Sequence, residues 1–80
     1  MEKVIVYSTP TCPYCHMAKE FLNKHKIPFE DVNIAKDQKA VQEMISKSGQ
    51  IGVPVIDIGG KIVVGFDQKK ISQLLGLKPE

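Results

Sequence analysis

Cys12 and Cys15 are the only cysteines of this 80-residue chain, and they lie three positions apart between an apolar run and a helical pattern. On a helix, side chains at i and i+3 share a face about 5–6 Å apart, within the Cα separation of about 4.4–6.8 Å that a disulfide tolerates. A disulfide stabilises a fold more when it closes a longer loop, so a bridge between these two cysteines would add little stability. The pair is instead expected to open and close reversibly on a framework that folds without it.

Hydrophobic periodicity predicts a strand, a helix and a second strand in the first half of the chain. Residues 4–7 form a short β-branched and aromatic run, which is typical of a strand covered on both faces. Between residues 13 and 25 the apolar positions recur at helical spacing, and residues 27–34 alternate apolar and polar side chains after Pro28. Two strands joined by such a helix form a right-handed βαβ unit with parallel strands.

The second half is expected to add a helix and a hairpin. Asp37 is a candidate N-cap for a helix over residues 37–48, which would end near Gly49. Residues 55–64 are typical of a hairpin, with Gly59-Gly60 as its two-residue turn. A turn of this length brings its two flanking strands together in antiparallel pairing.

A last helix completes the predicted fold class. Asp67 could cap this helix, and Gly76 and Pro79 could close it. The order β-α-β-α-β-β-α predicts an α/β protein with a four-stranded mixed sheet and helices on both faces. With 42% hydrophobic and 25% charged residues, the chain fits one soluble globular domain spanning residues 1–80.

Charge and hydropathy argue against nucleic-acid binding and membrane insertion. The net charge of +2 comes from lysines scattered among acidic residues, with no arginine and no basic block. Residues 1–7 contain no long apolar signal segment, and no run of about 18 apolar residues occurs elsewhere. We therefore expect a cytoplasmic protein, and a monomer, without nucleic-acid or membrane partners.

Thiol–disulfide exchange would give the two cysteines different roles. Cys12 falls where loop meets helix, and there the unpaired amides and the positive end of the helix dipole stabilise a thiolate. Cys15 lies one turn inside the helix, where it would be shielded and suited to resolving a mixed disulfide. A Cys-x-x-Cys pair in a βαβ pattern is typical of thioredoxin-like redox chemistry. Lys19 and His16 could add positive potential, although the sequence does not place them.

Two other classes of protein also contain closely spaced cysteines beside a histidine. Cys12-x-x-Cys15-His16 matches the attachment pattern of c-type haem, which would make the chain an electron-carrying cytochrome. That chemistry is expected outside the cytoplasm and in a helical protein. A metal site could join His16 or His25 to the two cysteines, or a cluster could be shared across a dimer. Structural zinc, however, takes four ligands, and the adjacent residues Cys15 and His16 point to different faces of a helix. We therefore expect no bound metal or cofactor.

Three blocks of the sequence resemble the glutaredoxin family. Thr11-Cys12-Pro13-Tyr14-Cys15 has the family's active-site motif, Val53-Pro54 falls at its cis-proline loop, and Val64-Gly65-Phe66-Asp67 occupies its glycine-containing segment. The resemblance extends over almost the whole chain. It implies a thioredoxin fold, a cis Val53-Pro54 bond, Cys12 as nucleophile and Cys15 as resolving thiol, with Pro13 and Thr11 in supporting positions.

The resemblance also implies a groove for glutathione. Its matching positions in this chain are Tyr14, Val53, Pro54, Gly65, Phe66 and Asp67. In this groove the Val53 backbone would hold an extended substrate in the manner of strand addition. Asp67 would meet the α-amino group of glutathione, a role compatible with capping a helix.

Two positions depart from the family's pattern. Thr9 stands three residues before Cys12, where glutaredoxins often have a lysine, and Val64 replaces the first glycine of a Gly-Gly pair. Gly65-Phe66 instead resembles the glutaredoxin-like electron donors of ribonucleotide reductase, which thioredoxin reductase reduces. The central residues of the cysteine motif, however, are those of the glutathione-dependent type.

The expected function is that of a dithiol–disulfide oxidoreductase. It would reduce protein disulfides, glutathione-mixed disulfides or both through a reversible Cys12–Cys15 disulfide, with glutathione as co-substrate and reductant. The alternative is an electron donor that thioredoxin reductase reduces. In both cases the partners are disulfide-containing or glutathionylated substrates and one electron-donor system.

Overall fold

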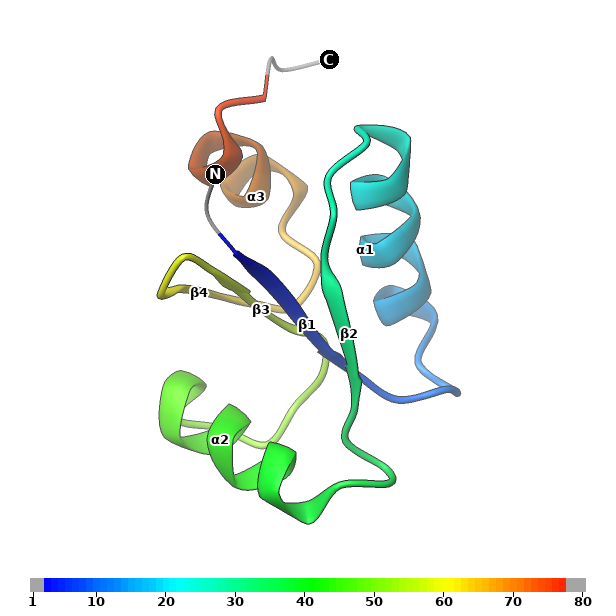
Figure 1. Ribbon diagram of the computed structural model, residues 1–80, viewed down its shortest axis with the longest axis vertical. Coiled ribbons are helices and arrows are strands. Elements are labelled where there is room, and N and C mark those ends of the chain that lie inside the picture. Colours follow the sequence, from blue (N-terminus) through cyan, green and yellow to red (C-terminus); the bar gives the residue numbers. More distant parts are fainter. Residues whose placement is uncertain (1–2, 78–80) are drawn as a thin grey trace.

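A computed structural model describes residues 3–77 of the chain (Figure 1). Its elements, in chain order, are β1 (Val4–Ser8), α1 (Pro13–Lys24), β2 (Glu30–Asn33), α2 (Gln38–Ser48), β3 (Val55–Ile58), β4 (Lys61–Val64) and α3 (Gln68–Leu75). The predicted order of strands and helices is confirmed. No helix among the described residues is long and apolar enough to cross a membrane.

The four strands form one mixed sheet in the order β2-β1-β3-β4. β1 pairs with β2 in parallel, as the βαβ pattern predicts, and pairs with β3 in antiparallel direction on its other side. β3 and β4 form the predicted antiparallel hairpin. Helices α1 and α3 cover one face of the sheet and α2 covers the other (Figure 1).

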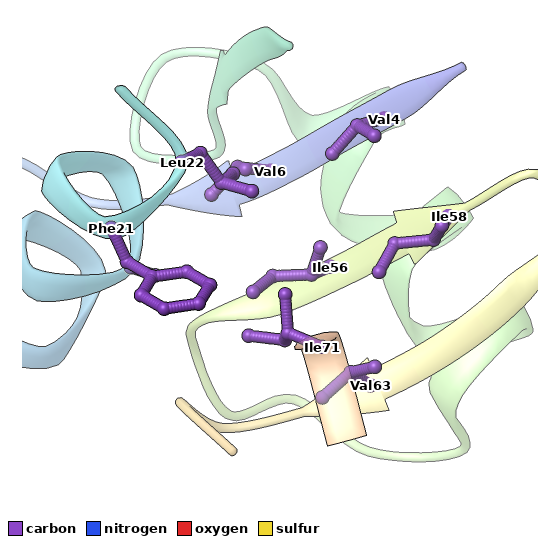
Figure 2. Close-up of a cluster of buried hydrophobic side chains, with 9 residues drawn as sticks. Val4, Val6, Phe21, Leu22, Ile56, Ile58, Val63 and Ile71 are labelled. Atoms are coloured by element: carbon purple, nitrogen blue, oxygen red, sulfur yellow. The ribbon is translucent and has the colours of Figure 1, made fainter. Parts of the chain in front are cut away.

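The larger hydrophobic core lies between the sheet and helices α1 and α3. Alternate strand residues supply one side of this core, because successive side chains of a strand point to opposite faces. Figure 2 shows these strand residues facing side chains from both helices. The buried members are Val4, Val6, Ala18, Phe21, Leu22, Ile56, Ile58, Val63 and Ile71. On the opposite face, Tyr7 and Val55 pack with Ala40 and Met44 of α2.

The strand expected to begin at residue 27 begins instead at Glu30. The reason is the way α1 ends. Lys26 adopts a left-handed backbone with φ 57°, so that its N–H donates to Asn23 and the Ile27 N–H donates to Leu22 at 2.9 Å. These two hydrogen bonds form a helix-terminating Schellman motif. Because glycine usually occupies the left-handed position, the lysine at this position did not indicate that the helix ends there.

The predicted caps of the other two helices are confirmed. The Asp37 carboxylate accepts hydrogen bonds from the Lys39 and Ala40 amides at 3.0 and 3.3 Å. Gly49 and Gly76 end α2 and α3 with φ near 76° and 71°. Pro79, which was expected to follow the last helix, lies outside the described residues.

A charged network fastens α2 to the sheet. Lys47 Nζ donates to Asp57 Oδ2 and to the Tyr7 hydroxyl, each at 2.8 Å, and the Gly60 amide donates to Asp57 Oδ1 at the same distance. Tyr7 and Asp57 are buried. Burial by itself raises the pKa of Asp57, but the hydrogen bonds from Lys47 and Gly60 outweigh it and lower the pKa below its ordinary value.

Replacing Lys47 should destabilise the protein, most strongly at neutral pH. Lys47→Met leaves the Asp57 carboxylate buried without its cation, so we expect a loss of about 2–3 kcal/mol in the free energy of unfolding. Because the pKa of Asp57 is lowered in the folded protein, its stabilising contribution is present above the ordinary carboxyl pKa. The difference from wild type should therefore shrink below about pH 4. Urea denaturation at several pH values measures both effects.

A double variant provides the control. Lys47→Met with Asp57→Leu removes both charges and should recover most of the lost stability. Equal stabilities for wild type and Lys47→Met at neutral pH would show that the pair contributes nothing.

Candidate functional site

The cysteine motif lies at the predicted junction of strand and helix. Helix α1 begins directly after the loop that follows β1, with Cys12 as its N-cap and Pro13 in its first turn (Figure 1). Pro13 suits this position because its fixed φ matches the helix and the first amides of a helix have no intrahelical acceptor. Thr11, one residue earlier, is exposed.

The sulfur of Cys12 caps α1. The Cys15 amide donates to Cys12 Sγ with an N···S distance of 3.2 Å, so the sulfur occupies the place of a capping oxygen. An amide donor and the positive end of the helix dipole both favour negative charge on this atom. Cys12 is half-buried, Cys15 is buried, and both are free cysteines.

Cys15 is held in its protonated form. Burial and the hydrogen bond with Cys12 raise the pKa of Cys15 to about 11, while the Thr9 backbone and the charge of Lys19 act in the opposite direction. Cys15 therefore has to lose a proton before it can attack a disulfide, because the thiolate is the nucleophile. One sulfur is accessible, and the other is shielded and protonated, so the first is the candidate nucleophile and the second the candidate resolving thiol.

The Val53-Pro54 peptide bond is cis, as the resemblance to glutaredoxins implied. Val53 is half-buried and Pro54 is buried. β3 starts directly after this bond, and its first residue, Val55, pairs with Tyr7 near the end of β1. Antiparallel pairing thus brings the start of β3 to the end of the sheet from which the chain runs to Cys12.

The glycine-containing segment meets the same end of the sheet. The Gly65 amide donates to the Pro54 carbonyl at 2.8 Å, and Gly65 has φ 79°. Phe66 is half-buried, and its ring packs edge-on against Phe21 with centroids 5.9 Å apart. Asp67 is exposed and caps α3, its carboxylate accepting from the Lys70 amide at 3.1 Å.

Exposed apolar side chains accompany the motif. Tyr14 is 63% exposed, and Met17, one turn further along α1, is 46% exposed. Ile51, two residues before Val53, is 70% exposed, and Val64 is 45% exposed. The sequence analysis missed Ile51, although an isoleucine between polar Gln50 and Gly52 in a predicted loop is a usable signal.

The two basic side chains near the motif have separate partners. His16 Nε2 lies 3.0 Å from the Pro10 carbonyl oxygen. Lys19 Nζ lies 3.0 Å from Asp31 Oδ2 in an ion pair. Within residues 3–77, no three His, Cys, Asp or Glu side chains gather as they would around a metal ion.

Comparison with known proteins identifies the family. A family model described as glutaredoxin matches residues 4–63. The chain belongs to the glutaredoxin family. It is 53% identical over 70 residues to an uncharacterized glutaredoxin-like 8.6 kDa protein in a rubredoxin operon of Clostridium pasteurianum, covering 88% of this chain and 93% of that protein.

Two further relatives connect this glutaredoxin to characterised sequences and structures. Glutaredoxin 3 of Escherichia coli strain K12 is 37% identical over 67 residues, covering 84% of this chain and 81% of that protein. The crystal structure of a thioredoxin-like protein variant superposes with a TM-score of 0.90 at 33% identity, covering 98% of this chain and 100% of the other. The glutaredoxin has the thioredoxin fold and, at the level of its family, is a thiol–disulfide oxidoreductase.

The burial of Cys15 predicts selective alkylation of this glutaredoxin. With a pKa of about 11, Cys15 is ionised to roughly one part in 10⁴ at pH 7. Limiting iodoacetamide at pH 7 should therefore modify Cys12 first and leave Cys15 thiol intact in the native protein, as peptide mass spectrometry would show. Alkylation in denaturant, where both thiols are exposed, is the control. Equal labelling of the two cysteines in the native protein would contradict the assignment.

Proposed function

We propose that this glutaredoxin reduces protein disulfides and glutathione-mixed disulfides through a reversible disulfide between Cys12 and Cys15. The observation that supports this most directly is the capping contact, in which the Cys15 amide donates to the half-buried Cys12 sulfur at 3.2 Å. It stabilises charge on the accessible sulfur and keeps the second sulfur one helical turn away. The cycle is proposed for a monomer in the reducing cytoplasm, without a bound cofactor.

The first step is attack by Cys12. Its thiolate forms a bond to one sulfur of the substrate disulfide, the substrate S–S bond breaks, and the departing sulfur takes a proton. Cys15 then loses its proton and attacks Cys12 Sγ. The Cys12–Cys15 bond forms, the mixed disulfide breaks, and the second substrate thiol leaves. The substrate gains two electrons, which the two cysteines supply.

The proposed binding groove comprises residues of the cysteine motif, the cis-proline loop and the glycine-containing segment. They are Tyr14, Val53, Pro54, Gly65, Phe66 and Asp67. The Val53 backbone would add an extended substrate as a strand, and the exposed ring of Tyr14 would cover the reacting sulfurs. Phe66 contributes less than its size suggests, because its ring packs against Phe21. Asp67 is the proposed contact for the α-amino group of glutathione, the proposed reductant.

A second electron donor, thioredoxin reductase, is supported by apolar exposure around the motif. Ile51 and Val64 are exposed beside the residues of the groove, and Thr9 offers no charge to a glutathione carboxylate. Exposed apolar side chains of this kind suit a protein partner, whose interface buries them. The two donors can be separated by experiment.

The roles of the cysteines predict different losses on substitution. Cys12→Ser should abolish reduction of both insulin disulfides and a glutathionylated peptide, because no attacking sulfur remains. Cys15→Ser should abolish insulin reduction but keep deglutathionylation, which one sulfur can complete with glutathione. Coupled NADPH consumption measures both reactions. Full activity of Cys12→Ser would overturn the proposed function.

Substitution of Asp67, the proposed contact for glutathione, tests which electron donor is used. Asp67→Asn keeps a good helix cap but removes the negative charge, so thermal stability should change little. In the assay with glutathione and glutathione reductase, the KM for the glutathionylated peptide should be about five-fold higher for Asp67→Asn than for wild type. This increase corresponds to one weakened charge-assisted hydrogen bond at an exposed site. Reduction by thioredoxin reductase should be unaffected. An unchanged KM would remove Asp67 from the groove, and rapid reduction by thioredoxin reductase alone would select the second donor.

A further inference from the structure

A chain of polar contacts ties Lys19, a cation on α1, to strands β2 and β1. Lys19 follows Cys15 by four residues, so the two side chains lie on the same face of α1. Lys19 Nζ pairs with Asp31 Oδ2 at 3.0 Å, and Asp31 Oδ1 accepts from the Ser8 hydroxyl at 2.8 Å. Ser8 is buried at the end of β1, and Asp31 belongs to β2. Two strands therefore restrain the Lys19 side chain, β2 directly and β1 through Asp31.

Cys15 needs such a cation in both directions of the proposed cycle. During resolution its sulfur must become a thiolate before it attacks Cys12. During reduction of the Cys12–Cys15 disulfide by a donor thiolate, Cys15 departs as a thiolate. Burial and the neighbouring Cys12 oppose this charge, whereas the Thr9 backbone and Lys19 favour it. Lys19 is half-buried, with 20% of its side chain exposed, so solvent screens its charge only in part.

We propose that Lys19 is a positioning residue for the resolving step. Asp31 and Ser8 hold its side chain in place, and its ammonium group stabilises negative charge on the Cys15 sulfur. This inference rests on the proposed dithiol function. The step is the one described above: Cys15 gives its proton to solvent, its sulfur bonds to Cys12 Sγ, and the substrate sulfur leaves and takes a proton. Lys19 forms and breaks no bond in this step.

The position of Asp31 accounts for the moderate size of the expected effect. Its carboxylate, 45% exposed, offsets part of the Lys19 charge while it restrains the side chain. The remaining effect on Cys15 should appear as about a three- to ten-fold change in its thiolate concentration at pH 7.

The two chemical steps can be observed separately with an aromatic disulfide that releases coloured nitrothiobenzoate. Attack by Cys12 releases the first equivalent, and attack by Cys15 on the resulting mixed disulfide releases the second. Stopped-flow absorbance from pH 6 to pH 10 gives a rate profile for each step. The variants are Lys19→Gln, Lys19→Arg and, as a matched loss of charge on the same helix, Lys24→Gln.

We expect Lys19→Gln to slow the second release about three- to ten-fold at pH 7 and to move its pH profile to higher pH. The first release should be unchanged, and Lys19→Arg and Lys24→Gln should follow wild type in both steps. In a Cys15→Ser background, Lys19→Gln should have no effect on the first release. Arginine keeps the charge, so its behaviour separates the effect of charge from any loss of folding.

Two results would overturn the inference while leaving the proposed function intact. One is an unchanged pH profile for the second release in Lys19→Gln. The other is equal slowing of both releases, since that would indicate a general structural defect. If wild type gave no second release at all, the dithiol mechanism itself would fail, which is a different and recognisable outcome.

Discussion

The antiparallel pairing of β1 with β3 is the constraint on which the site depends. It sets the end of one strand beside the start of the other, with Tyr7 opposite Val55. The cysteine motif follows the first strand and the cis Val53-Pro54 bond precedes the second, so two segments about forty residues apart meet at one end of the sheet. The hydrogen bond from Gly65 to the Pro54 carbonyl adds the third segment. The buried core on both faces of the sheet holds this register.

Burial then distinguishes two chemically identical side chains. Cys12 precedes the first helical residue and stays accessible, whereas Cys15 lies one turn later on the face of α1 that packs toward the sheet. The helix N-terminus stabilises charge on the first sulfur. The same packing that buries the second sulfur also raises its pKa, which makes its deprotonation the demanding step. The Lys19 cation is proposed to assist this step by stabilising the Cys15 thiolate.

Local patterns in the sequence predicted the fold well, because each element has its own signal. Asp37 and Asp67 cap helices as their positions indicate, and the Gly59-Gly60 turn closes the expected hairpin. The start of β2 was misplaced because Lys26, not glycine, adopts the left-handed conformation that ends α1. The cysteine pair followed from its own spacing and setting. The cis bond and the groove residues came only from the family resemblance, since no local property of Val53-Pro54 distinguishes cis from trans.

The Lys47–Asp57 and Lys19–Asp31 ion pairs were beyond prediction for a different reason. Lys47–Asp57 and Lys19–Asp31 join residues of separate elements, and a sequence with eleven lysines offers many such pairings. Only the sheet register and the helix positions select among them. Lys47 with Asp57 fastens α2, and hence the start of the segment that leads to Val53, to the sheet. Lys19 with Asp31 restrains a cation near Cys15. The two pairs thus act on opposite faces of one sheet. The first holds α2 against the sheet, and the second holds the cation proposed to stabilise charge on the resolving sulfur.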